Sequence, residues 1–423
     1  MSGTPLYLAG LLGHGDVLAA VSAEEAEGAA YVAGTDILRL PDGSLRYVPP
    51  GADGPVTVPA GDVGAAEAAG GTREWLALGD VPGRTSDEVE TAARALLDLR
   101  LLVRSNGAVA AAWHGIWQYA WPRDASWVAA ALSMTEHLTE AREILAFTAR
   151  AQRADGTWDA RLLLDGSGVP DERPWQLDAN GWVPWAAWMY ASAGGEIDAA
   201  TYRMVVGACD HVAANLGDDG LPPATPDYWE SRVDAPTIGL AAPLLTGLRA
   251  GVDLATAQGR RSHAARWTDA ATRLAGGIDA SFGGCGYRRT PRADSGADSG
   301  VTFLAPPFAP ESPEVTAAVL EARRRLTRPN AGVVPGEAWT GEDSWTPETA
   351  FFALAAAASG RRDEATGTLA WLIAHRTPLG TLPEKVRPDG APAAVAPLAF
   401  TAAAVLLTLV ALDRGLPVVP VPG

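Results

Sequence analysis

Eleven segments of helical periodicity dominate this chain of 423 residues, and they constrain its fold more than any other feature. In each of them apolar residues recur every three or four positions over roughly 12–22 residues. Alanine is frequent on these segments, which suits helix formation and close helix packing. The links between them hold almost no convincing strand, so the sequence predicts an all-α domain. The predicted helices are 87–105, 124–135, 138–153, 178–192, 198–215, 236–257, 260–281, 312–327, 346–359, 362–375 and 396–413.

Long linkers separate some of these helices and hold the polar, aromatic and Gly/Pro-rich stretches. Structureless loops longer than about 12–15 residues are uncommon in compact domains and are usually functional. About twelve helices whose long loops gather on one side predict a barrel of helical hairpins, (α/α)6, with the active site where the loops converge. An α-solenoid has the same periodicity, although no sequence repeat of about 34 or 40 residues is visible. The linkers are 154–177, 216–235, 282–311, 328–345 and 376–395.

The first part of the chain differs from the rest. Apolar residues alternate on both sides of Asp42 and Gly43, which predicts a β-hairpin. The stretches "GPVTVPAG" and "REWLALGDV" are interpreted as further short strands. We therefore predict a small β-rich region over 1–82 and a barrel domain over 83–423, with Ser86 as the N-cap of the first barrel helix.

Charge, cysteine content and hydropathy exclude several classes of protein. The net charge of −17 at pH 7 argues against nucleic-acid binding, because phosphates would be repelled. Cys209 and Cys285 are too few for a disulfide framework and are expected to be buried thiols, with a single bridge as the alternative. The N-terminal sequence lacks the basic region of a secretory signal, and no apolar run long enough to span a membrane is uninterrupted. We therefore expect a cytoplasmic protein without a membrane span.

Tryptophan is unusually abundant, with 15 residues against 8 Tyr and 7 Phe. Nine of the 15 lie between Trp113 and Trp188. Indole faces stack on the apolar C–H faces of sugar rings, but buried indoles also supply core area. The tryptophans are therefore typical of either a carbohydrate site or a Trp-rich core.

Two aromatic stretches hold side chains suited to binding sugar hydroxyl groups. In "YAWPRDASW", Asp124 can accept two hydroxyl hydrogen bonds and Arg123 can donate several in a fixed fork. Asp124 could instead be a charge at a helix N-terminus, with Arg123 as its local partner. In "PWQLDANGW", Gln176, Asp178 and Asn180 offer further donors and acceptors among tryptophans.

Two other stretches each place a glutamate in an unusual setting. In "DYWESR", Glu230 follows Trp229, and a carboxyl group packed on an indole is desolvated, which suits a general acid. A surface pair between Glu230 and Arg232 is the alternative. In "TLPEKVRPDGAP", Glu384 lies on a rigid loop before an apolar helix and can point into a cavity. A solvated surface Glu beside Lys385 is the alternative.

These four stretches, in this order, resemble glycoside hydrolase family 15, the glucoamylase and glucodextranase type. The Trp-x-Arg-Asp motif of that family is matched by "WPRD", its Trp-Glu motif by "WESR" and its late glutamate by "LPEKV", and "RPWQLDANGW" resembles its segment that contains Gln-x-Asp-Gly. The resemblance covers about residues 85–415. It implies an exo-acting, inverting hydrolase that releases β-glucose from α-glucosides, with Glu230 as general acid and Glu384 as general base. Neither a metal nor another cofactor is expected, since the six histidines show no ligand spacing.

The resemblance also implies which side chains bind the substrate, an oligosaccharide or glucoside. Trp339 and Trp345 belong either to the rim of this pocket or to the core. Asp294 and Asp298 could bind calcium or a second sugar, or lie in a solvated flexible loop. The implied substrate-binding residues, among which Trp121, Trp175 and Trp229 would form the walls, are Tyr119, Trp121, Arg123, Asp124, Trp175, Gln176, Asp178, Trp229 and Arg232.

Other functions on the same barrel remain as alternatives. Trehalose, an isomalto-oligosaccharide or a glucosylated metabolite could be the substrate, because the loops decide specificity. Phosphorolysis would need a phosphate site in place of Glu384. The chain also differs from the family in its short N-terminal region and in the "PLAF" that opens its last helix, where a tryptophan is frequent. A non-catalytic sugar-binding protein is therefore a further alternative.

Overall fold

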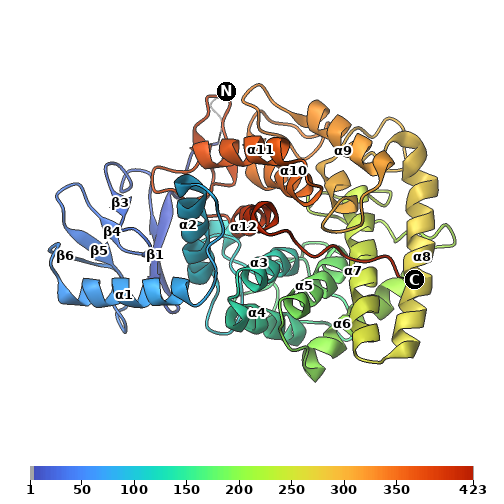
Figure 1. Ribbon diagram of the computed structural model, residues 1–423, viewed down its shortest axis with the longest axis horizontal. Coiled ribbons are helices and arrows are strands. Elements are labelled where there is room, and N and C mark those ends of the chain that lie inside the picture. Colours follow the sequence, from blue (N-terminus) through green and yellow to red (C-terminus); the bar gives the residue numbers. More distant parts are fainter. Residues whose placement is uncertain (1–3, 423) are drawn as a thin grey trace.

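The computed structural model describes residues 4–422 and consists of a small β-rich region beside a large helical domain (Figure 1). This arrangement confirms the predicted helical fold with a small N-terminal β-rich region. All eleven predicted helices are present, and their ends lie within a few residues of the predicted ends.

Within the described residues, six helical elements form a closed inner ring, in which each element contacts the next and the last contacts the first. One further helix packs against the outside of each of them, so successive elements alternate between the two rings. The inner elements are α3 (Pro122–Met134), α5 (Ala179–Ser192), α7 (Ile238–Ala257), the 3-10 helix η3 (Ser299–Leu304), α10 (Thr346–Ala358) and α12 (Ala399–Asp413). The outer helices, in the same order, are α4 (Leu138–Arg150), α6 (Ala199–Asn215), α8 (Arg261–Phe282), α9 (Pro313–Leu326), α11 (Arg362–Ala374) and α2 (Ser86–Leu102).

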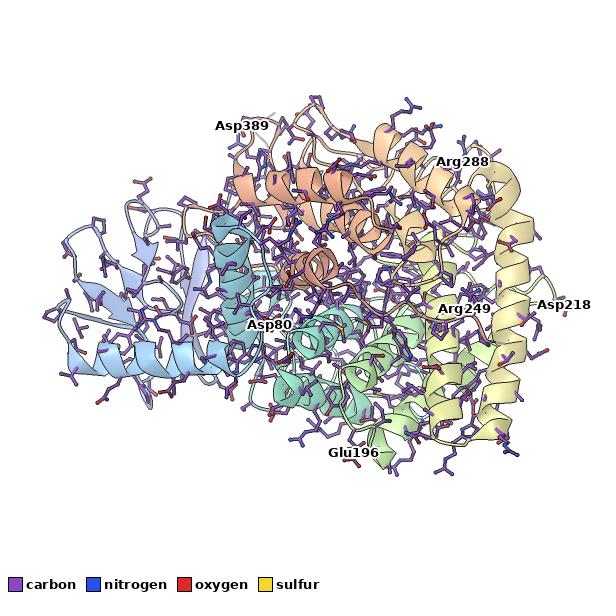
Figure 2. All side chains as sticks on the ribbon, in the orientation of Figure 1. Asp80, Glu196, Asp218, Arg249, Arg288 and Asp389 are labelled. Atoms are coloured by element: carbon purple, nitrogen blue, oxygen red, sulfur yellow. The ribbon has the colours of Figure 1, made fainter. Side chains whose placement is uncertain are left out.

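The residue pattern of each helix explains which ring it joins. All residues of α3 are buried, and so are those of α12 up to Leu412. The outer helix α4 instead buries one stripe, which is the pattern of an amphipathic surface helix. Charged residues such as Glu196, Asp218 and Asp389 lie at the periphery (Figure 2). α7 is long and apolar enough to cross a membrane, but 89% of its apolar window is buried inside the protein, as in a core helix.

Trp127 lies at the centre of the inner ring. It is fully buried, and its ring centroid lies 5.3 Å from that of Trp182 and 5.1 Å from that of Phe400. Several of the tryptophans therefore form a Trp-rich core. Cys209 is buried and Cys285 is half-buried, and neither forms a disulfide.

The N-terminal region consists of two antiparallel sheets and one helix. The predicted hairpin is present: strands β4 and β5 pair, and Gly43 adopts a positive φ of 87° in the turn. β1 pairs with β2, and β3 to β6 form a four-stranded sheet in sequence order. The strands are β1 (Gly10–His14), β2 (Val17–Val21), β3 (Ala30–Tyr31), β4 (Leu38–Arg39), β5 (Leu45–Tyr47) and β6 (Val56–Val58).

Two local predictions for this region are wrong. The "REWLALGDV" stretch does not form a strand, because its first five residues end helix α1 (Val63–Ala77). Asp62 caps this Ala-rich helix by accepting from the backbone N–H of Ala65 at 2.9 Å. The N-cap of α2 is Thr85 and not Ser86, since the hydroxyl of Thr85 accepts from the N–H of Glu88, whose carboxylate reaches back in a capping box.

A small sheet that the sequence did not predict lies among the loops of the helical domain. Its three strands have two residues each; the second and third are close in the sequence, and the first comes from a distant segment. Because the middle strand directly follows Glu384, the sheet fixes the position of that residue. The strands are β7 (Ser344–Trp345), β8 (Lys385–Val386) and β9 (Pro392–Ala393).

Candidate active site

A cavity of about 260 Å³ lies at the N-terminal ends of the inner helices α3, α10 and α12. Ligand pockets usually measure about 300–1,000 Å³, so this cavity suits a small ligand. Polar, charged and aromatic side chains line it together. They are Trp117, Trp121, Arg123, Asp124, Arg161, Arg173, Tyr228, Trp229, Glu230, Trp339, Trp345, Glu348, Glu384 and Lys385, with Ala111, Ile116, Pro335, Pro347, Leu398 and Phe400 completing the walls.

The main chain of Glu384 is bonded on both sides. Its N–H donates to the carbonyl oxygen of Val395 at 2.8 Å, and its carbonyl oxygen accepts from the N–H of Thr346 at 3.1 Å. Its neighbour Lys385 begins strand β8, which pairs with β7 and β9. The backbone therefore holds Glu384 in a fixed place at the cavity.

The carboxyl group of Glu384 has one partner and one free oxygen. Oε1 accepts a hydrogen bond from the indole N–H of Trp117 at 3.0 Å. Oε2 lies 3.8 Å from the Lys385 ammonium and accepts no hydrogen bond from any described residue. Burial raises the pKa of Glu384, while Lys385 and the Trp117 hydrogen bond lower it. The free oxygen of this residue, which is only 7% exposed, can accept a hydrogen bond from a water.

Glu230 lies on a tight turn with a strained backbone. Its φ is +56°, which non-glycine residues rarely adopt, and its N–H donates to the carbonyl oxygen of Asp227 at 2.8 Å. Oε1 accepts from the indole N–H of Trp121 at 2.6 Å and lies 3.4 Å from Arg123, and Oε2 forms an ion pair with Arg173. The side chain is 25% exposed.

The ring of Trp229 packs elsewhere than the sequence predicted. It lies 3.6 Å from the guanidinium of Arg289 and edge-on to Trp339, with 5.1 Å between the ring centroids. The carboxyl group of Glu230 instead contacts the indole N–H of Trp121 and two guanidinium groups. Trp229 therefore forms a wall of the cavity and does not shield the glutamate from solvent.

Arg123 connects the residues of the first two motifs. Its Nη1 donates to Gln176 at 2.8 Å and to Asp178 at 3.1 Å, and its Nε lies 3.4 Å from Asp124. Gln176 and Asp178 are buried behind the cavity wall, so they position Arg123 and do not line the cavity.

Asp124 lines the cavity with an unused acceptor. Its Oδ2 has no hydrogen-bond partner among residues 4–422. Burial raises the pKa of Asp124 to about 6, although the adjacent Arg123 lowers it. A sugar hydroxyl group could donate to this oxygen.

A buried ionic network supports the turn that carries Glu230. Arg289 donates to Asp227 at 3.1 Å and to Asp298 at 2.8 Å, and the hydroxyl of Tyr228 donates to Asp298 at 2.6 Å. Both aspartates are fully buried. The interpretation of Asp298 as a solvated loop residue is therefore wrong: its carboxylate accepts from the N–H of Gly300 and caps η3.

Besides Gln176 and Asp178, three further predicted binding residues lie outside the cavity lining. Trp175 is 36% exposed, and its ring is edge-on to His211 with 6.1 Å between the centroids, so it does not form a wall. The next three residues are buried just before α5, which leaves Trp175 on the outer side of the chain. Arg232 is exposed to solvent. Tyr119 is half-buried behind the wall, with the guanidinium of Arg161 4.7 Å from its ring.

Sequence reasoning missed several residues that the structure brings to the cavity. Trp117 contacts Glu384, Arg173 contacts Glu230, and Glu348 adds a third glutamate to the cavity. The available signal for Glu348 was a lone carboxylate at the start of an otherwise apolar helix, "TPETAFFALAAAA". Trp339 and Trp345, whose place the sequence left open, both line the cavity.

Two smaller questions concern metal binding. Asp294, the other candidate for calcium binding, is exposed to solvent, whereas Asp298 is buried. Among residues 4–422, no group of three or more His, Cys, Asp or Glu side chains is arranged as metal ligands would be.

Comparison with known proteins identifies the fold. No family model and no curated protein sequence matches the chain. A glycosidase variant solved in complex with glucose is similar to it, with 21% identity and a TM-score of 0.68 over 78% of this chain and 99% of the other. A bacterial glucoamylase complexed with acarbose shows 14% identity and a TM-score of 0.65 over 83% of this chain and 59% of the other. The family 15 glucoamylase from Hypocrea jecorina shows 14% identity and a TM-score of 0.58 over 76% of this chain and 69% of the other. The chain therefore has a fold like that of family 15 glycoside hydrolases.

Proposed function

We propose that the protein is an exo-acting, inverting glycoside hydrolase that releases β-glucose from α-glucosides, built on an (α/α)6 barrel. One observation carries the proposal: a single cavity holds the carboxyl groups of Glu230 and Glu384 together with the Arg123–Asp124 pair. The fold shared with glycosidases and glucoamylases supports it.

The Arg123–Asp124 pair would bind the terminal sugar. Asp124 has an unused acceptor oxygen at the cavity, and Arg123 is fixed by two buried partners in the segment just before α5. Leu398 and Phe400, at the start of α12, also line the cavity. A small cavity that ends on inner helices accommodates the end of a saccharide chain, which favours exo action.

The two glutamates would divide the acid and base roles. Glu230 protonates the glycosidic oxygen, and Glu384, ionised, deprotonates a water that attacks the opposite face of the sugar. An inverting enzyme needs about 6.5–9.5 Å between the two carboxyl groups, so that this water fits. The free Oε2 of Glu384 is an acceptor for that water. The reaction requires only the two carboxyl groups and water.

Proton NMR of the anomeric region during hydrolysis tests the proposal. Maltose, isomaltose, trehalose and maltotriose are the substrates, and the fastest of them identifies the linkage. We expect β-glucose first and α-glucose only after mutarotation. Initial α-glucose would contradict the role of Glu384, and glucose binding without release from any substrate would favour a sugar-binding protein.

A further inference from the structure

A third glutamate, Glu348, lines the cavity together with Glu230 and Glu384. Glu348 is the third residue of α10, as Asp124 is the third residue of α3. These two inner helices flank α12, so the two carboxyl groups approach the cavity from different helices.

Glu348 is buried without the partners that a carboxyl group normally requires. It is 4% exposed, and its Oε2 has no hydrogen-bond partner among residues 4–422. The helix around it is apolar and buried up to Ala357. An unpaired polar group in such a place costs stability unless a hydrogen bond forms there. A ligand in the cavity would supply that bond.

The charges around Glu348 indicate which protonation state it adopts. Burial raises the pKa of Glu348 to about 8, and the backbone at the start of its own helix lowers it. The negative charges of Glu384 and Asp298 also raise this pKa, and the positive charge of Lys385 lowers it. The raised pKa favours the carboxylic acid at neutral pH, and this form can donate as well as accept a hydrogen bond.

We propose that Glu348 binds the terminal sugar directly by donating a hydrogen bond to one of its hydroxyl groups, and so selects sugars that carry that hydroxyl. The inference rests on the proposed function. Asp124 would accept from one hydroxyl while Glu348 donates to another. Because a site that hydrogen-bonds a hydroxyl group rejects analogues without it, Glu348 becomes a specificity-determining residue.

Binding of glucose and of its 2-, 3-, 4- and 6-monodeoxy analogues, measured by calorimetry, tests this role. The wild-type protein should bind one analogue about 10-fold or more weakly than glucose. Glu348→Leu should weaken glucose binding by about 10–100-fold and remove the discrimination against that same analogue. Glu348→Gln retains an N–H donor and should stay within about 5-fold of the wild type for glucose.

A second buried glutamate provides the matched control. Glu88 is 5% exposed in the capping box of α2, away from the cavity. Glu88→Leu should lower the melting temperature and leave the discrimination between glucose and the deoxy sugars unchanged. If Glu348→Leu does not fold, Glu348→Met replaces it, since the variant needs only to lack the hydrogen-bond donor.

The outcomes separate this inference from the proposed function. Unchanged discrimination in a folded Glu348→Leu variant overturns the inference alone, and so does a Glu348→Gln variant as weak as the Leu variant. Glucose binding without hydrolysis of any glucoside overturns the hydrolase function but leaves the role of Glu348 measurable. Absence of glucose binding by the wild-type protein overturns the inference, and the hydrolysis assay then decides the proposed function separately.

Discussion

The two glutamates at the cavity are held in different ways. Glu384 is fixed by its main chain, which bonds to Val395 and Thr346 and continues into a three-stranded sheet. Glu230 lies on a strained turn, and its side chain is held by charged and indole donors. Backbone hydrogen bonds hold a residue in one fixed position. Hydrogen bonds to a side chain can instead be replaced by bonds to a ligand when it enters the cavity. The difference fits a base that must place a water and an acid that must meet a leaving group.

The N-terminal region belongs to this comparison, because within residues 4–422 it hydrogen-bonds to the segment that follows Glu384 and not to the turn of Glu230. The N–H of Tyr7 donates to Ala394 at 2.8 Å, and the N–H of Ala394 donates to Pro5 at 2.9 Å. The segment of Glu230 is supported instead by the buried Arg289 network. The two glutamates therefore depend on different parts of the molecule, which gives each its own set of predicted variants.

The largest expected effect comes from the glutamates themselves. Glu230→Gln and Glu384→Gln should each lower kcat on maltose by about 10²–10⁴-fold, the usual contribution of a general acid or base. α-Glucosyl fluoride distinguishes them, because fluoride leaves without protonation. Glu230→Gln should regain most of its activity on this substrate, and Glu384→Gln should not. Equal behaviour of the two variants would show that the assigned roles are wrong.

The next largest effect concerns the network under the turn of Glu230. Arg289→Met leaves the buried carboxylates of Asp227 and Asp298 without their cation, and such a loss costs about 3–5 kcal/mol. Urea unfolding measures the change. Arg292→Met is the matched control, because Arg292 pairs with Asp234 at the surface and its loss should not change stability measurably. A loss below about 1 kcal/mol for Arg289→Met would contradict the bracing role.

Removal of the Trp117 indole N–H, which donates to Glu384, should lower the activity less than the loss of either glutamate. Trp117→Phe deletes a hydrogen bond to a charged group, which is worth about 1.5–3 kcal/mol, so kcat should fall roughly 10-fold or more. That bond lowers the pKa of Glu384, so its loss raises the pKa. The base must be ionised, and the acidic limb of the kcat/KM profile should therefore move to higher pH.

Trp121→Phe is the control for this pH profile. It removes the corresponding indole N–H at Glu230 and leaves the partner of Glu384 in place. The acidic limb should then stay where it is in the wild-type protein. A shift of that limb in Trp121→Phe, or none in Trp117→Phe, would contradict the assignment of the base.

A modest effect is expected at the contact between the N-terminal region and the segment of Glu384. The hydroxyls of Thr377 and Thr381 both donate to the carbonyl oxygen of Ala9 at 2.8 Å. The double change Thr377→Val and Thr381→Val leaves this buried acceptor unpaired, which costs about 1–3 kcal/mol. We expect a lower melting temperature and a kcat reduced about 2–5-fold.

Thr368→Val provides the control for that pair. Its hydroxyl donates only to the carbonyl oxygen of Glu364 within α11, at 2.9 Å, so both quantities should stay unchanged. If the double variant loses stability but keeps the kcat of the wild type, the N-terminal region stabilises the fold without positioning Glu384.

The fold was largely predictable because its signal is local. Helical periodicity and alanine content act over one or two turns, and they gave all eleven helices of the double ring. The three-stranded sheet escaped prediction, because two-residue strands have no periodicity and the pairing of β7 with β8 joins segments that are distant in the sequence. "REWLALGDV" was assigned to a strand because an apolar run this short is compatible with both a strand and a helix. It is helical up to Ala77 because it continues α1, which Asp62 caps.

The site was predictable only where a motif identified a residue. Arg123, Asp124, Glu230 and Glu384 were named from three of the four stretches, and the structure brings them to one cavity. Glu348 lies in none of these motifs, since its place at the cavity depends on how α10 packs in the inner ring. A motif also does not fix where each of its side chains points, which is why neighbouring residues of the same stretch can face away from the cavity.

Trp175 tests whether a residue of a predicted motif can lie away from the cavity, and its replacement should have the smallest effect on activity. It belongs to the "PWQLDANGW" stretch, but it is exposed and outside the cavity lining. Trp175→Ala should change kcat/KM on maltose by no more than about 2-fold, as surface substitutions usually do. Trp229→Ala, which removes a wall of the cavity beside Glu230, should lower it by more than about 10-fold. A comparable loss in Trp175→Ala would mean that this loop folds over the bound sugar, so that the aromatic wall predicted from the sequence forms only in the complex.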